Sequence, residues 1–245
     1  MAFSIPLLTP FVHRDSVPEG NLIVIGPSGI GKTILCETIM NELLLTGARI
    51  MYVTLDHSPE DIRSRIQARD FSISENKMPL MFVDGYSWLV GEATEKYSAR
   101  NLSNLSDLSV KMISASNELG KGIFFIFDSV SSLLVYNAEN EVERFLGVNM
   151  ARMKHAHNLG LWVVEQGIHS ESFYNVLRHK SDGVLEMKFK ENDQGTVERY
   201  ARLHTFKNLK HEILWKSFDI EKGQLIFKDR DREKDLYLTA YMKNS

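Results

Sequence analysis

One stretch of this sequence decides which fold to expect: Leu22-Ile23-Val24-Ile25-Gly26-Pro27-Ser28-Gly29-Ile30-Gly31-Lys32-Thr33. Its apolar first third predicts a buried strand, and the apolar periodicity after Lys32 predicts a helix. The spacing Gly-x4-Gly-Lys-Thr between the two elements is typical of a phosphate-binding loop. The glycines let the main chain wrap closely and point N–H groups inward, and the helix adds the positive end of its dipole. We therefore expect a nucleoside triphosphate to bind here.

The residues of this loop have expected roles. The residues from Gly26 to Ile34 are predicted to contact the nucleotide, with Lys32 on the β- and γ-phosphates and the Thr33 hydroxyl on Mg²⁺. A second Mg²⁺ ligand is expected at the end of a neighbouring strand, where the apolar run 123–127 is followed by Asp128. Many strands end in an aspartate, so this second signal is strong only in combination with the loop.

The overall composition excludes several other classes of protein. The 245 residues include 29 Lys and Arg against 32 Asp and Glu, a balance without the basic excess of a nucleic-acid-binding protein. The single cysteine, Cys36, excludes an internal disulfide. Apolar runs are far shorter than the roughly 20 residues that cross a membrane, and the first ten residues do not resemble a signal peptide. We therefore expect a cytoplasmic protein.

Short apolar runs alternate with longer amphipathic segments along the chain, which is typical of a mostly parallel sheet flanked by helices. We expect one α/β domain over 1–245, with a core at about 19–227, antiparallel strands near its C-terminal end and a charged tail at 228–245. The expected strands are 22–25, 50–55, 80–83, 123–127, 161–164, 184–189, 199–206, 213–220 and 225–227, and the expected helices are 32–45, 61–69, 105–118 and 142–158.

Five segments, in their order and spacing, resemble one family: 26–33, 51–61, 83–88, 127–133 and 180–185. They are similar to the KaiC-like branch of the RecA-fold P-loop ATPases, especially its small single-domain archaeal members, and the similarity extends over about 19–227. The resemblance implies a RecA-like sheet that binds ATP and Mg²⁺ at the carboxyl ends of its strands. It also implies a homo-oligomeric ring or filament in which ATP lies between subunits.

The general base departs from the family pattern. Clock-protein members carry two adjacent glutamates after the second strand, where this sequence has Asp56-His57. A base must come within about 3 Å of the attacking water, and Asp56 is one methylene shorter than a glutamate. Asp56 is therefore a candidate base, with capping of the following helix as the alternative. His57 is either a second candidate base or a solvent-facing side chain.

Two further positions are assigned by the resemblance. Members of this branch carry a lysine-x-arginine pair on a late strand that reaches the γ-phosphate of a neighbouring subunit, and the corresponding residues here are Lys207 and Leu209. Lys207 is either this contact or an ordinary exposed lysine. A polar sensor is expected after the strand 161–164, at Gln166 or Glu165, while His169 is expected to be an exposed loop residue.

These features leave three functions open. The first is a slow, oligomeric ATPase or nucleotide-dependent switch. The second is an ATP-gated scaffold that hardly hydrolyses ATP and serves a partner complex such as a motility motor, which the changed base and the missing arginine favour. The third, a DNA recombination paralogue, is disfavoured because the sequence offers neither a basic excess nor a separate DNA-binding domain. The identity of a partner is not encoded in any motif.

Overall fold

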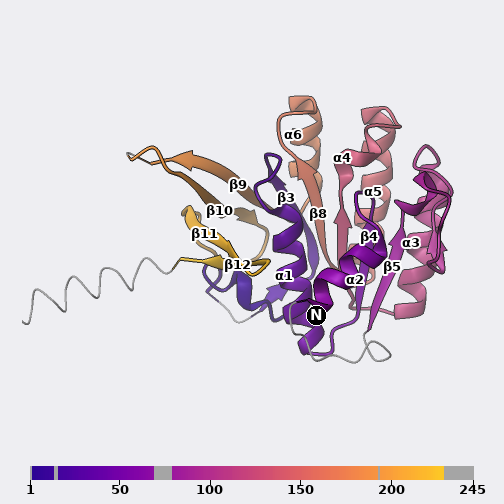
Figure 1. Cartoon of the computed structure of the whole chain (residues 1–245), viewed down its shortest axis with the longest axis horizontal. Helices are drawn as coiled ribbons and strands as arrows, with labels where there is room; N and C mark the ends of the chain where they lie inside the picture. Colours follow the sequence, from indigo (N-terminus) through magenta and orange to yellow (C-terminus); the bar gives the residue numbers. More distant parts are fainter. Residues whose placement is uncertain (1, 14–15, 69–78, 193, 229–245) are drawn as a thin grey trace, which may run out of the picture.

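The computed structural model describes residues 2–13, 16–68, 79–192 and 194–228. A ten-stranded sheet runs through the middle of the molecule (Figure 1). In spatial order its strands are β12 (Gln224–Phe227), β11 (Lys216–Glu221), β10 (Val197–Phe206), β9 (Gly183–Glu191), β3 (Gly20–Gly26), β8 (Leu159–Glu165), β7 (Phe124–Asp128), β4 (Ile50–Thr54), β5 (Leu80–Asp84) and β6 (Tyr97–Ser98). The strands from β9 to β6 are parallel, so their carboxyl ends share one edge. The strands beyond β9 are antiparallel.

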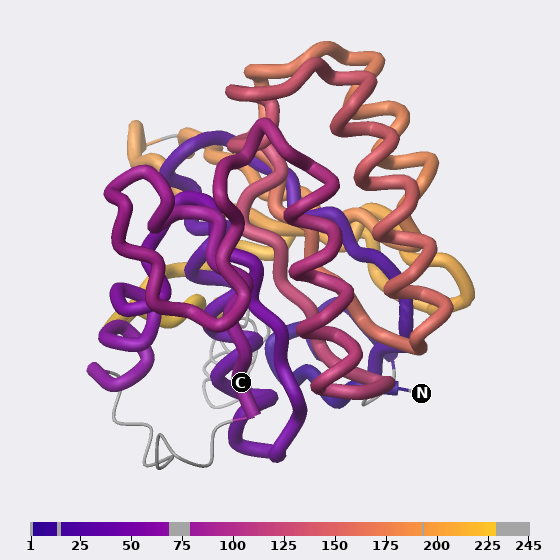
Figure 2. Tube along the Cα trace, turned by 90° about the vertical axis from the view of Figure 1, so that its right-hand side faces the viewer, coloured from indigo at the N-terminus to yellow at the C-terminus, as the bar shows by residue number. Residues whose placement is uncertain are grey.

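Helices cover both faces of this sheet. On the first face lie η1 (Pro6–Leu8), α1 (Lys32–Leu45) and α2 (Pro59–Gln67), next to a small sheet of β1 (Ala2–Phe3) and β2 (Val17–Pro18). On the second face lie α3 (Leu105–Leu119), α4 (Val130–Leu133), α5 (Glu139–His155) and α6 (Glu171–Lys180), with η3 (Ser87–Leu89) after β5. Here α3, α5 and α6 lie side by side (Figure 2). None of the helices in the described ranges is long and apolar enough to cross a membrane.

The central strands are apolar throughout because both of their faces are covered. In β7, Phe124 and Ile126 belong to the core on the α1 side, whereas Phe125 and Phe127 belong to the core on the α3 and α5 side. This alternation follows from the period of two in a strand. The strand is therefore fixed from both faces, and with it the position of the residue at its end, Asp128.

The predicted apolar face of α1, formed by Leu35, Ile39 and Leu43, is buried, but Cys36 and Met40 are buried as well. The helix is covered on its outer side by the beginning of the chain, which the sequence patterns did not place. The apolar side chains of that segment that share a core with α1 include Ile5, Leu7, Leu8 and Phe11. The glycine-rich loop 26–33 is therefore followed by a helix that is held from two sides.

The structure confirms the predicted fold class: a mostly parallel sheet flanked by helices, with antiparallel C-terminal strands. The helix expected at 32–45 has those bounds, while α5 is shifted toward the N-terminus relative to 142–158 and α6 was not predicted. The strand expected at 213–220 begins only at Lys216, because Ile213 and Leu214 are 62% and 67% exposed. Of the expected tail at 228–245, only Lys228 belongs to the described residues.

Candidate functional site

The loop between β3 and α1 has the main-chain shape that its sequence predicts. Gly29 and Gly31 have φ angles of 72° and 109°, which residues with side chains rarely adopt. A Cβ atom on Gly31 would lie 2.9 Å from the Cδ1 atom of Ile220 in β11. Within the described residues, no side chain caps the first turn of α1 and no acidic residue lies in it. The free N–H groups of this turn are therefore available to an anion.

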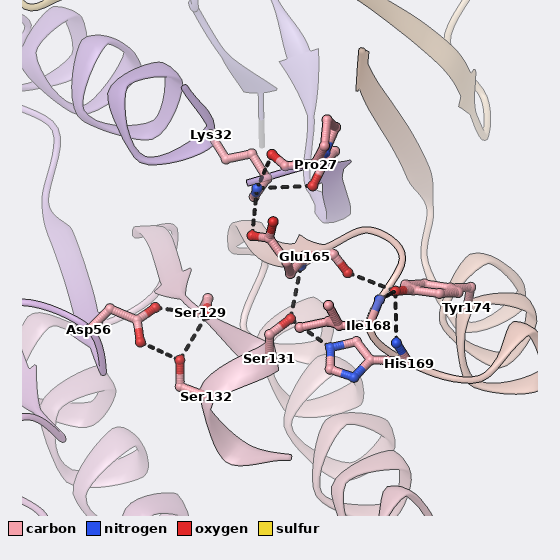
Figure 3. A network of polar contacts seen from close by, with 11 residues as sticks. Pro27, Lys32, Asp56, Ser129, Ser131, Ser132, Glu165, Ile168, His169 and Tyr174 are labelled. Carbon is pink, nitrogen blue, oxygen red and sulfur yellow. Dashed lines mark hydrogen bonds and ion pairs between the residues drawn. The ribbon is translucent and has the colours of Figure 1, made fainter. Parts of the chain in front are cut away.

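The side chain of Lys32 folds back onto the loop and contacts the end of β8, the neighbouring strand in the sheet (Figure 3). Its ammonium group donates hydrogen bonds to the carbonyl oxygens of Gly26 and Pro27, at 2.9 and 2.8 Å. It also forms an ion pair with the Oε2 atom of Glu165, at 2.8 Å. These three partners use all three N–H groups of the ammonium. Because the side chain is only 8% exposed, the group is held at the floor of the site.

Asp128 and Thr33 meet beside this lysine. Asp128 accepts a hydrogen bond from the hydroxyl of Tyr52, with 3.0 Å between the oxygens, and it is also hydrogen-bonded to Thr33. Burial raises the pKa of Asp128 to about 6; the bond to Thr33 opposes this rise and the negative charge of Asp56 adds to it. A buried carboxylate next to a hydroxyl is a donor set that suits Mg²⁺, whose charge would offset the cost of burial.

Asp56 lies in the same cleft, on the loop after β4. Its carboxylate accepts hydrogen bonds from Ser129, at 2.8 Å, and from Ser132. The alternative role predicted for Asp56, capping the next helix, is wrong, because Ser58 accepts the N–H of Asp61 at the start of α2. Its role as a base stays a prediction. Neighbouring His57 is half-buried, and its proposed role stays open.

Two residues were predicted as alternatives for the polar sensor, Gln166 and Glu165. Gln166 is exposed, and its main-chain N–H donates to the carbonyl oxygen of Gly26 at 2.9 Å. Glu165 instead turns its carboxylate into the cleft and onto Lys32. Glu165 therefore lines the cleft beside the loop, and Gln166 is not among the lining residues.

Most of the candidate residues line one cleft of about 280 Å³ at the carboxyl edge of the sheet, but Gln166 and Lys207 do not. It is lined by Ser28, Gly29, Gly31, Lys32, Thr33, Ile34, Asp56, Asp128, Ser129, Val163 and Glu165. Four separate segments, at the carboxyl ends of β3, β4, β7 and β8, contribute to it. This is the edge at which parallel α/β sheets bind their ligands.

Comparison with known protein families shows a match to the KaiC ATPase family over residues 5–231. The chain belongs to the KaiC ATPase family. Among solved structures, the fold is similar to that of a KaiC-like protein from the hyperthermophilic archaeon Pyrococcus horikoshii OT3, with a TM-score of 0.72 and 15% sequence identity. That similarity covers 94% of this chain and 99% of the other. No curated protein matches the sequence significantly.

Lys207 lies away from the cleft of this KaiC family member. It follows β10, whose last residue, Phe206, pairs with Gly183, which in turn pairs with Leu22 near the start of β3. The Lys207 ammonium donates to the carbonyl oxygen of Ser181 at 2.6 Å. The lysine is therefore at the opposite edge of the sheet from its own phosphate-binding loop. Leu209, in the place of the expected arginine, is buried in the core.

A polar network behind the cleft was missed by the sequence analysis (Figure 3). Ser131 accepts the main-chain N–H of Glu165 at 2.8 Å, and its hydroxyl lies 2.8 Å from Nε2 of His169. Tyr174 donates to the carbonyl oxygen of Glu165 at 2.8 Å and accepts the N–H groups of Ile168 and His169, both at 3.2 Å. The prediction that His169 is an exposed loop residue is wrong: it is half-buried, and burial lowers its pKa.

A signal for part of this network was present in the sequence of this KaiC-family chain. Ser129, Ser131 and Ser132 follow the buried strand β7 directly, so their hydroxyls had to lie at the same edge as Asp128. Tyr174, in contrast, belongs to the helix that was not predicted, α6. The hydrogen-bond partners of Tyr174 therefore could not be predicted from the sequence alone.

Proposed function

We propose that this chain is a Mg-ATP-binding switch that hydrolyses ATP slowly and acts as an oligomer in the cytoplasm. The observation that carries the proposal is the meeting of Lys32, Thr33 and Asp128 in one cleft, at a helix N-terminus whose N–H groups are free. A nucleoside triphosphate site requires a cation, a pair of metal ligands and main-chain donors. Groups that suit all three requirements lie together here.

The proposed roles follow from the chemistry of each group. Lys32 and the first turn of α1 would hold the phosphates, and Thr33 and Asp128 would hold Mg²⁺, which supplies positive charge to the phosphate oxygens. Tyr52 keeps Asp128 in place, and burial raises the pKa of Tyr52 so that its hydroxyl stays a donor. Asp56 would orient the attacking water.

Slow hydrolysis is proposed from two features of the site. The carboxylate of Asp56 is engaged by two serine hydroxyls, which must yield or share it before a water can be oriented. The arginine of the family pattern is absent, because position 209 is a leucine, and its side chain is buried. Where an arginine finger has been measured, it contributes a factor of about 10³–10⁵ in rate.

Oligomerisation is proposed because the residue assigned to the γ-phosphate, Lys207, cannot contact the cleft of its own chain. It lies at the other edge of the sheet, beside Ser181 and Asp182. A head-to-tail contact between subunits would bring the edge of the sheet that carries Lys207 in one chain to the cleft of the next chain. In this arrangement each site is completed by a neighbour.

The test is ATP turnover with Mg²⁺ by the purified protein, followed together with oligomer mass by light scattering. We expect slow turnover that rises with assembly and is lost in Lys32→Ala. A matched control is Lys96→Ala, which removes an exposed lysine that pairs with Glu118 and does not line the cleft. If turnover survived in Lys32→Ala, the assignment of the site would be wrong.

A second candidate function is an ATP-gated scaffold without useful hydrolysis. The observation in its favour is that both reactive groups of the cleft are already occupied: Lys32 by Glu165 and Asp56 by the serines. Tight nucleotide binding without turnover, with oligomer mass still dependent on nucleotide, would select this function over the first.

A further inference from the structure

We infer that Glu165 is a specificity-determining residue that selects against the γ-phosphate, so that a nucleoside diphosphate competes strongly with the triphosphate for this site. The inference rests on the proposed nucleotide-binding function and adds a preference that the phosphate-binding loop alone does not specify. Its starting point is the 2.8 Å ion pair between Glu165 and Lys32, in a cleft where Glu165 is only 22% exposed.

The position of Glu165 is fixed by its main chain. In the register of the sheet it pairs with Gly26, the first residue of the loop. Its N–H donates to Ser131 and its carbonyl oxygen accepts from Tyr174, at 2.8 Å in both cases. The main chain is thus held from two helices, α4 and α6, and cannot withdraw from the loop. Only rotation of the side chain can move the charge.

A nucleoside diphosphate and a triphosphate differ in whether the ion pair between Lys32 and Glu165 can persist when they bind. The β-phosphate lies inside the loop, where the main-chain N–H groups and the Lys32 ammonium converge. The ammonium can turn from the carbonyls of Gly26 and Pro27 toward that phosphate while its third N–H stays on Glu165. A diphosphate is therefore compatible with the ion pair.

A γ-phosphate must extend from the loop toward the opposite wall, which carries Glu165, Asp56 and Asp128. Mg²⁺ bound by Thr33 and Asp128 would offset the charge on one side of this wall. On the side of Lys32, the γ-phosphate has to replace Glu165 on the ammonium, and it then lies next to a carboxylate of like charge. The triphosphate consequently loses affinity that the diphosphate retains.

The experiment is calorimetric titration with MgADP and with the Mg²⁺ complex of the β,γ-imido analogue of ATP. We expect Glu165→Gln and Glu165→Ala to raise the affinity for the triphosphate relative to the diphosphate by about tenfold, while the ADP affinity changes little. Glu186→Gln is the matched control, because Glu186 is similarly buried and pairs with Arg202 outside the cleft. It should leave the ratio unchanged.

The outcomes separate this inference from the proposed function. If both nucleotides bind the wild-type protein and the ratio stays the same in both variants, the inference is overturned and the proposed function stands. If the wild-type protein binds neither nucleotide, the proposed function is wrong and the inference falls with it. An unchanged ratio together with loss of turnover in Glu165→Gln would make Glu165 a catalytic residue and would also overturn the inference.

Discussion

At the scale of single residues, the acidic side chains of this protein differ in what their surroundings do to the charge. Asp128 is buried and its pKa is raised to about 6, chiefly by burial, whereas Glu165 is matched by an ammonium group. Outside the cleft, burial also raises the pKa of Glu42 on α1, although the carboxylate accepts the N–H of Leu7 at 3.0 Å. The surroundings of these carboxylates therefore affect the free energy of the ionised form differently.

Glu42 makes the stability of the fold depend on pH. Since its pKa in the folded protein is raised above its ordinary value of 4.5, its contribution is fully favourable below that value and is lost as pH rises through the folded pKa. We therefore expect Glu42→Gln to be more stable than the wild type in urea unfolding at pH 7. The difference should disappear at about pH 4.

A control of opposite sign is Glu139→Gln. Hydrogen bonds from the side chain and main chain of Ser170 lower the pKa of Glu139, so its ionised form is favoured in the folded state above its ordinary pKa. This substitution should destabilise the protein at pH 7, and its effect should shrink as the pH falls. An increase in stability for both variants at pH 7 would contradict the assignment of the two environments.

At the scale of elements, the end of β8 and the start of α6 are joined by one hydroxyl. Tyr174 is buried on α6, and its three hydrogen bonds reach Glu165, Ile168 and His169. The chain between the two elements is thereby tied to the strand that ends beside the phosphate-binding loop.

Tyr174→Phe should loosen this connection without changing the packing of the ring. The main-chain groups that lose the hydroxyl are partly buried, so we expect a loss of about 1–3 kcal/mol in the free energy of unfolding. Faster hydrogen exchange at Ile168 and His169 should accompany it. Tyr97→Phe serves as a control, because its hydroxyl bonds Glu118 at the surface. Equal stability and unchanged exchange in Tyr174→Phe would show that the hydroxyl does not hold the segment.

The elements that were predictable from the sequence are those with a strong local pattern. Apolar runs gave the central strands, and the glycine loop gave the start of α1. The missed helix α6 carries an apolar set, Phe173, Tyr174 and Leu177, but it is short and its remaining residues are polar. The cover of α1 by the N-terminal segment was beyond prediction, because it depends on contacts between residues far apart in the chain.

At the scale of the whole molecule, the candidate site is divided between two edges of one sheet. The loop, the proposed Mg²⁺ ligands and Glu165 are at the carboxyl edge, while Lys207 is at the other. The sequence sufficed to predict that the loop and Asp128 would lie together, since strand ends of a parallel sheet converge. It could not distinguish Glu165 from Gln166, because side-chain direction at a strand end depends on the neighbouring strands.

Mixing two inactive variants tests whether neighbouring chains share a site. The variant Lys32→Ala has an impaired cleft and an intact Lys207. The variant Lys207→Ala has an intact cleft but lacks the lysine at the opposite edge of the sheet. We expect each variant to be inactive alone and an equal mixture to recover roughly a quarter of the wild-type turnover, because random head-to-tail assembly joins an intact cleft to an intact Lys207 with that frequency.

The mixture must be compared with the sum of the separate variants. A mixture no more active than that sum would argue against a shared site. Full activity of Lys207→Ala alone would show that Lys207 is an ordinary surface lysine.

The strand order also has a consequence for protein synthesis. The strand that leads into the phosphate-binding loop, β3, hydrogen-bonds to β8 and β9, and both come from later parts of the sequence. While the chain leaves the ribosome, β3 therefore emerges without either hydrogen-bonding partner, and its main-chain N–H and C=O groups stay without their strand partners until β8 has been translated. A ribosome stalled before β8 would hold a nascent chain that contains the complete loop motif but lacks Val163 and Glu165, the part of the cleft that β8 supplies.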